Sequence, residues 1–405
     1  MAPEPGELGA LAVPFLERQP WFLAETQDVA ASDRAPRLVD SEVVLDGRPG
    51  LASLIVNSGE RAFHLLVGWR DAADVPALLG ARHGAVLGVA HDDDGEVVCY
   101  DALADDELAL ELLRVASSSG QSAARVRVVQ SLASHASLVF DERLFMKCYR
   151  VLEPSPRPEV ELLWKLDGAG FNYLLGPVAR WERRGYDLAL VREYVAGAVE
   201  GRALALTSLR DLLGRGEVDP RLRAEVAETA GGDLASEMRR LGEMTGHLHL
   251  ALADAFGTLS LRGTTDARPG LQIRVHGDFH LRRVMRTDAG WILAGFGDDP
   301  LISRAASGAS SSPLASPLED LADLTYSLRE VADEAVAARP ATAFGAARRL
   351  GDGWVARNAG SFLDGYLSVS AIEELVPGDR STVATVLEGL VASRVARGRP
   401  YPARG

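Results

Sequence analysis

The chain has 405 residues, of which 47% are apolar and 25% are charged, a composition ordinary for a soluble globular protein of about two to three domains. Its formal net charge of −14 at neutral pH argues against a surface that binds nucleic acid by neutralising phosphates. No window approaches the roughly 20 apolar residues that a membrane span needs, so we expect no membrane-spanning helix.

The N-terminal stretch "MAPEPGELGALAVPFLERQPWF" has no basic segment and no long apolar run, so we expect no signal peptide and a cytoplasmic location. The two cysteines, Cys99 and Cys148, are too few for a disulfide framework. We expect both to be small buried side chains in a reducing compartment.

Short alternating runs separated by turn signals fill residues 38–102 and predict an antiparallel sheet of hairpins. The stretch "DELALELLRVASS" after it is typical of a helix. A second β-rich region starts at residues 124–130 and leads to a helix that Pro158 opens and Gly168 closes.

The pattern turns helical from about residue 202 onward. Apolar residues at spacings of three and four predict one buried helix face, made of Leu234, Met238, Leu241, Thr245, Leu248 and Leu252. Residues 303–317 are small, polar and low in complexity, and we expect them to form a mobile loop.

The stretch "VHGDFHLRRVMRTDAGWILAGFGDDP", residues 275–300, places Asp278 after a glycine turn. A carboxylate in such a loop suits a base that accepts the hydroxyl proton during phosphoryl transfer. The same residue suits a purely structural role at a tight turn, and the two readings are compatible.

These segments together resemble the bacterial maltokinases, relatives of the aminoglycoside phosphotransferases. The resemblance covers nearly the whole chain and rests on "LERQPWF", "LFMKCYRVLEPSPRPEVEL", "LALVREYVAGAVEGRALALTSLRDLL", "LGEMTGHLHLALA", "HGDFHLRRVMRTDAGW" and "SPLEDLADLTYSLREVA" in that order. It implies an α+β, protein-kinase-like bilobal fold with a β-rich N-terminal cap. The implied domains are the cap over 1–120, the rest of the N-lobe with the hinge over 121–200, and a helical C-lobe over 201–405.

The resemblance also implies roles for individual residues. Lys147 would neutralise the α- and β-phosphates of ATP, held by Glu161 on the following helix. In the hinge "VREYVAG", backbone groups of Glu193 and Val195 would face the adenine. The turn "SLASHAS", 131–137, would cover the phosphates, and Asp278 would be the catalytic base.

This sequence departs from the family at the metal and sugar positions. A glutamine that binds magnesium is replaced by Arg283, and the metal-binding aspartate of the family's D-F-E-G-E-P by Gly295, with Gly297 at the next acidic position. The last helix, "VASRVARGRP", lacks the family's tyrosines and glutamates near the sugar.

Three hypotheses follow from these departures. The first is a pseudokinase that binds ATP weakly and serves binding or regulation, with no metal at Arg283 and Gly295. The second is an active, divergent sugar or aminosugar kinase in which Asp298 or Asp299 holds Mg²⁺. The third is a binder of phosphate ligands that uses Arg283 instead of magnesium. The resemblance points to an enzyme of trehalose and α-glucan metabolism as the first protein partner to test.

Overall fold

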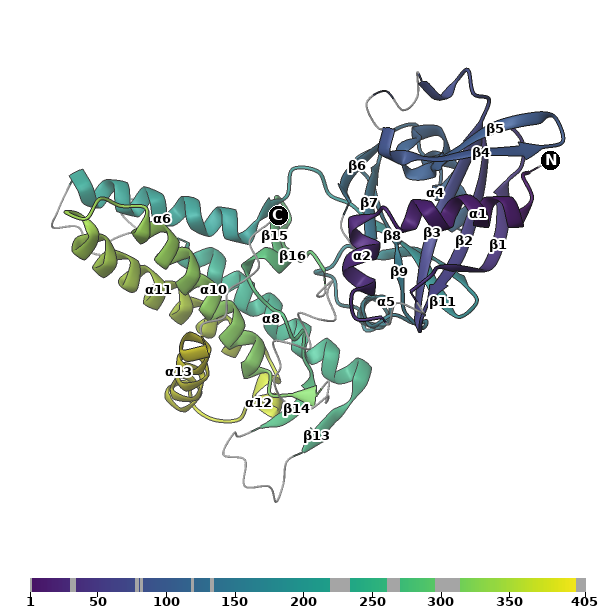
Figure 1. Cartoon of the computed structure of the whole chain (residues 1–405). Helices are drawn as coiled ribbons and strands as arrows, with labels where there is room; N and C mark the ends of the chain where they lie inside the picture. Colours follow the sequence, from purple (N-terminus) through teal and green to yellow (C-terminus); the bar gives the residue numbers. More distant parts are fainter. Residues whose placement is uncertain are drawn as a thin grey trace. The chain divides into compact units, whose positions relative to one another are not determined.

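The computed structural model describes residues 2–29, 34–76, 80, 83–117, 120–131, 135–218, 234–260, 270–295 and 314–397. The chain divides into two compact units (Figure 1). The first unit comprises Met1–Glu161 and Gly176–Ala196, and the second comprises Leu162–Leu175 and Gly197–Gly405. The chain therefore passes between units within the segment that the sequence predicted as a hinge.

The N-terminal half of the first unit is an antiparallel sheet with helices beside it, which confirms the predicted cap. Its elements are α1 (Pro5–Leu16), α2 (Pro20–Thr26), β1 (Arg37–Leu45), β2 (Gly50–Ser58), β3 (Arg61–Arg70), β4 (Val86–Asp92) and β5 (Gly95–Asp101). The strand order is β1-β2-β3-β5-β4, and the short strand β9 (Val151–Leu152) also pairs with β3.

The second sheet of this unit is antiparallel as well, with the order β10-β11-β8-β7-β6. Its strands are β6 (Val126–Ser131), β7 (His135–Phe140), β8 (Leu144–Tyr149), β10 (Pro177–Arg183) and β11 (Tyr186–Glu193). The helix α4 (Asp106–Ala116) joins the two sheets in sequence, and the side chain of Asp105 caps its first turn.

The two sheets share one hydrophobic core. Strands β2 and β3 are buried along nearly their whole length, because α1 and α2 cover one of their faces and α4 covers the other. On the α4 side, Leu51 and Leu108 of the cap lie in the same cluster as Phe140, Met146 and Val191 of the second sheet. This shared core explains why "GLASLIV" is buried throughout and, apart from Ser53, apolar instead of alternating.

The second unit is mainly helical, as predicted, but it also contains two small sheets. Its helices are α6 (Gly201–Val218), α8 (Ala235–Phe256), α10 (Leu318–Ala337), α11 (Phe344–Leu367), α12 (Ile372–Leu375) and α13 (Arg380–Arg397). One sheet has the order β12 (Val199–Glu200), β15 (Val284–Thr287), β16 (Gly290–Leu293), and the other β13 (Thr258–Ser260), β14 (Leu271–Arg274), β17 (Leu314–Ala315). The helix α5 (Pro158–Gly168) contains the boundary between the units.

Helix α8 packs closely against α11 in the helical unit. All six residues of the predicted apolar face are buried. The helix packs against α11 at two glycines, since an added Cβ on Gly242 would lie 2.0 Å from the carbonyl oxygen of Phe362, and one on Gly365 would lie 1.9 Å from that of Arg239. Only glycine permits such a close backbone approach. No helix in the described part of the chain is long and apolar enough to cross a bilayer.

A fragment comprising residues 121–405 should aggregate or fail to fold. Removal of the cap would uncover the core face of the second sheet, which α4 and β2 cover in the intact chain. Solubility and thermal melting of this fragment, compared with the full chain, test the expectation. A soluble monomeric fragment with unchanged melting would contradict a shared core.

His64 should make the first unit sensitive to acid. It is buried between Ser53 Oγ (2.8 Å from Nε2) and the carbonyl oxygen of Tyr149 (3.2 Å from Nδ1). Burial and then the charge of Arg183 lower the pKa of His64 to about 3. The unfolded chain therefore binds an extra proton between about pH 3 and the usual histidine pKa of about 6.5, so stability falls as the pH falls through this window.

We expect His64 to reduce the free energy of unfolding by about 2 kcal/mol between pH 7.5 and pH 5. Urea unfolding of the wild type and of His64→Gln at both pH values measures this contribution as a difference. Identical pH slopes for the two proteins would show that His64 does not remain neutral in the folded state.

Candidate active site

In the first unit, Lys147 lies on β8, the central strand of the second sheet. Its side chain is buried, and its Nζ lies 2.8 Å from Oε2 of Glu159 on α5. The hydroxyl of Tyr149 donates to the same oxygen at 3.2 Å. The neighbours Met146 and Cys148 point into the shared core, as the alternation of a strand requires.

The sequence predicted Glu161 as the partner of Lys147, whereas the ion pair described here is with Glu159. Both glutamates lie in the first turn of α5. Sequence reasoning missed Glu159, because two acidic residues so close together on one short helix give no signal that distinguishes them. The proposed pairing of Lys147 with Glu161 stays a prediction.

The predicted hinge, residues 191–197, begins within β11, which ends at Glu193. The backbone N–H of Glu193 donates to Gly176 O at 3.0 Å, and that of Tyr194 donates to Arg143 O at 2.8 Å. Val195 is 38% exposed. The adenine contacts expected of Glu193 and Val195 stay a prediction. In the expected phosphate-covering turn, residues 132–134 lie outside the described residues, and β6 and β7 flank them.

In the second unit, the loop from His276 to His280 runs from β14 to the single helical turn η4 (Leu281–Arg283). Gly277 has a φ of +81°, a conformation that favours glycine. The backbone N–H groups of His276 and Gly277 both donate to the carboxylate of Asp320 on α10, at 2.8 and 2.9 Å.

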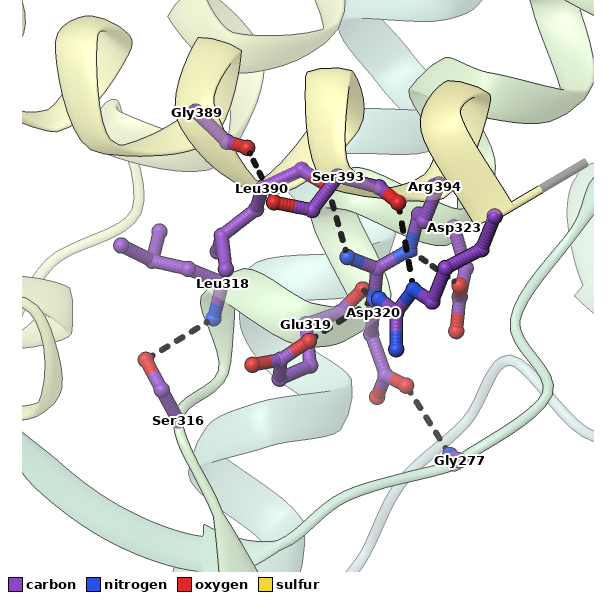
Figure 2. A network of polar contacts seen from close by, with 11 residues as sticks. Gly277, Ser316, Leu318, Glu319, Asp320, Asp323, Gly389, Leu390, Ser393 and Arg394 are labelled. Carbon is purple, nitrogen blue, oxygen red and sulfur yellow. Dashed lines mark hydrogen bonds and ion pairs between the residues drawn. The ribbon is translucent and has the colours of Figure 1, made fainter. Parts of the chain in front are cut away.

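Asp320 is fully buried and belongs to a chain of hydrogen bonds. Its Oδ2 lies 3.1 Å from Nε2 of His249 on α8, and Nδ1 of His249 lies 3.0 Å from the hydroxyl of Tyr366 on α11. Burial alone raises the pKa of Asp320, but the hydrogen bonds from His249 and Gly277 and the nearby imidazoles outweigh it and lower that pKa below its usual value. Asp320 is therefore an ionised anchor for the loop (Figure 2).

Asp278, the predicted base, is paired with Arg283, which the resemblance places at a metal-ligand position. Its Oδ2 accepts from Nη2 and Nε of Arg283 at 2.6 and 3.1 Å and lies 3.5 Å from Nε2 of His280. Burial raises the pKa of Asp278, but the hydrogen bond from His280 and the charge of Arg283 more than reverse this and hold that pKa well below its usual range. The carboxylate is therefore ionised and already neutralised by a neighbour.

His276 is hydrogen-bonded to Gly295, the position at which the resembled family carries a metal-binding aspartate. Its Nε2 lies 3.0 Å from the carbonyl oxygen of Gly295, and its Nδ1 accepts from the N–H of Asp278 at 3.3 Å. Burial lowers the pKa of His276 to about 4, so the imidazole is neutral at physiological pH. Because Nδ1 accepts a hydrogen bond, the proton of the neutral imidazole lies on Nε2, which donates to the carbonyl oxygen of Gly295.

The described residues do not fit a magnesium site. Arg283 brings a positive charge, and Gly295 has no side chain to coordinate a cation. Among the residues that the structure covers, no group of three or more His, Cys, Asp or Glu is arranged to hold a metal. Asp298 and Asp299, the fallback ligands, and Gly297 lie outside the described residues.

The helix expected near a sugar, α13, is tied to α10 by Arg394. This buried arginine lies 2.6 Å from Asp323 and 2.8 Å from Glu319, and it also donates to the carbonyl oxygens of Glu319 and Leu390 (Figure 2). The small residues beside it, such as Ala392 and Val395, are exposed. Arg394 was missed in the sequence, where it reads as one of several surface arginines.

Asp320 and Asp323 were also missed, although they leave a signal in "SPLEDLADLTYSL". Both lie among Leu318, Leu321 and Leu324, on the face that an amphipathic helix buries. An aspartate at such a position needs internal partners. This reasoning would have identified Asp320 and Asp323 as buried carboxylates. It would not have identified their partners, which are the loop backbone and Arg394.

Comparisons with known proteins find a matching family domain and solved structures of similar fold. The maltokinase N-terminal cap domain matches residues 15–105. A solved structure of a glucosamine kinase in complex with glucosamine, ADP and inorganic phosphate is 20% identical, with a TM-score of 0.62, over 98% of this chain and 94% of the other. A structure of glucosamine kinase in crystal form A matches over the same shares at 20% identity and a TM-score of 0.61.

At this level of identity, the structural likeness establishes the fold. Residues 15–105 thus match the maltokinase N-terminal cap domain, and the chain has the fold of the solved glucosamine kinase.

Proposed function

We propose that this protein is a catalytically silent relative of the maltokinases, in which a sugar-kinase scaffold serves ligand binding or regulation. The observation that carries the proposal is the ion pair between Arg283 and Asp278. Arg283 stands at the position of a metal ligand in the family, and Asp278 is the expected base. One ion pair therefore occupies both the metal position and the base.

Electrostatics supports this proposal. Phosphoryl transfer relies on positioning and on neutralisation of charge, and bound magnesium supplies much of the neutralisation. A cation approaching Asp278 would meet a carboxylate that is already paired with a guanidinium at 2.6 Å. Gly295 offers no second ligand.

The competing proposal is an active ATP-dependent sugar or aminosugar kinase that holds Mg²⁺ through Asp298 or Asp299. The Lys147–Glu159 ion pair favours it, because a buried lysine held by a helix glutamate is what a nucleotide site requires. The likeness to a glucosamine kinase suggests glucosamine and maltose as the acceptors to test.

The unmodified protein should form no sugar phosphate from ATP, Mg²⁺ and either acceptor. The measurement is product formation by mass spectrometry, with Asp278→Asn as the matched background. Turnover of about 1–100 per second, an ordinary kinase rate, that disappears in Asp278→Asn would reject the proposal and establish the competing one.

Restoring both family ligands should restore part of the metal site. The double variant Arg283→Gln/Gly295→Asp should bind Mg·ATP about tenfold more tightly than the wild type. The backbone tolerates the change, since an added Cβ at Gly295 meets no described atom within 4 Å. Calorimetric titration measures the affinity.

Each single variant should gain much less, because one ligand beside an arginine or a bare glycine cannot hold the ion in octahedral geometry. Sugar phosphorylation should stay poor in the double variant, since α13 lacks the family's sugar-binding side chains. Equal Mg·ATP affinities in the wild type and the double variant would mean that Arg283 and Gly295 are not the cause of silence.

A further inference from the structure

The second unit contains a cavity of about 430 Å³ whose lining shares no residue with the loop around Asp278. It lies between the turn that follows α5 and one face of α8. Tyr173 of the turn and His247 of α8 form one wall, with their rings inclined by 17° and the ring centroids 5.8 Å apart. Asp254, about two helical turns after His247, lies further along the same face of α8. The volume is in the range of sites that bind small molecules.

The turn that forms this cavity is held in place by its own contacts. Gly170 has a φ of +74°, which favours glycine and ends α5. The N–H of Phe171 donates back to the carbonyl oxygen of Leu166 at 3.0 Å, and the buried ring of Phe171 lies 5.5 Å from that of Tyr173. The carbonyl oxygen of Tyr173 accepts the N–H of Leu293 at 2.7 Å. A ligand therefore binds without first having to order this wall.

The charge around the cavity favours a cation. Its lining includes the carboxylate of Asp254 and, within the part of the chain that the structure describes, no lysine or arginine. The carboxyl-terminal turns of α5 and α8 both border it, and the last carbonyl groups of a helix carry partial negative charge. Lys165 and Arg274 each lie 4.4 Å from the ring centroid of Phe256, which is two residues after Asp254 and so on another side of α8. Phosphate and other anions therefore do not suit this cavity.

We propose that the cavity binds a small organic ammonium ion with a flat apolar body. The ammonium group pairs with Asp254, and the body lies along Leu250 and Ala251 toward the rings of Tyr173 and His247. Seven residues of an α-helix correspond to about 10 Å along its axis, a span that an arylalkylamine covers. Burial of the apolar body is needed for binding, because an ion pair at an exposed carboxylate contributes little alone.

An occupant of the cavity also acts on the strand that precedes Gly295. Leu174, next to Tyr173, forms an isolated β-bridge with Leu293, in addition to the hydrogen bond from Leu293 to Tyr173. Opening of the turn breaks these contacts and removes the wall of the cavity at the same time. A ligand at ten times its dissociation constant should therefore slow hydrogen exchange of the Leu293 amide about tenfold.

The experiment is an NMR titration of the full chain at neutral pH with phenethylamine, phenethyl alcohol and phenylpropionate, which share a ring and differ in charge. Phenethylamine should bind with a dissociation constant of about 1 mM, at least about fivefold more tightly than the alcohol, and the carboxylate should bind most weakly. Asp254→Asn should weaken binding of the amine about fivefold and leave that of the alcohol unchanged. His247→Ala should weaken both, because it removes part of the wall. Thermal melting of each variant confirms that it is folded.

Asp167→Asn is the matched control, since it removes the same charge from the end of α5 at a residue that does not line the cavity. It should change the affinity for the amine less than about twofold. Equal losses in the two aspartate variants would mean general electrostatic attraction and overturn the inference. No binding of the amine, equal affinities for amine and alcohol, or amine binding that leaves hydrogen exchange at Leu293 unchanged would also overturn it. None of these outcomes involves Arg283 or Asp278, so sugar-kinase turnover decides the proposed function separately.

Discussion

The buried carboxylate of Asp320 is the constraint on which the site depends. It accepts hydrogen bonds from the backbone of His276 and Gly277 and from His249, and an ionised carboxylate without these donors would be costly in the interior. The donors come from the loop and from α8, and Tyr366 extends the chain to α11. The position of Asp278 therefore follows from the packing of three helices.

Because Asp320 holds the loop, the position of the loop does not depend on the side chains at positions 283 and 295. The contacts that hold the loop use backbone N–H groups and residues of α8, α10 and α11, and none of these contacts involves the side chain at position 283 or 295. The contacts to Asp320 that hold the loop therefore do not depend on the side chain of Arg283. The arginine then pairs with the nearest carboxylate, Asp278.

The cap in turn supports the strand that carries Lys147. Lys147 lies on a strand whose other face packs against α4 and cap residues such as Leu108. Strand β9, which follows the Lys147 strand, pairs with β3 of the cap. The geometry of the lysine thus depends on a core that the cap completes, which is a physical reason for the cap to accompany this fold.

The sequence by itself determined the secondary-structure elements and the positions at which this chain departs from the family it resembles. Period-two and helical patterns predicted the sheets and the buried face of α8, because burial imposes those spacings on the chain, and Arg283 and Gly295 were readable because a metal site needs specific ligands. Only the tertiary structure decided the partners: Glu159 beside Lys147, Arg283 on Asp278, and Asp320 beneath the loop. Such pairs join residues up to tens of positions apart in the sequence. Local sequence patterns do not show which charged groups come together when the helices pack.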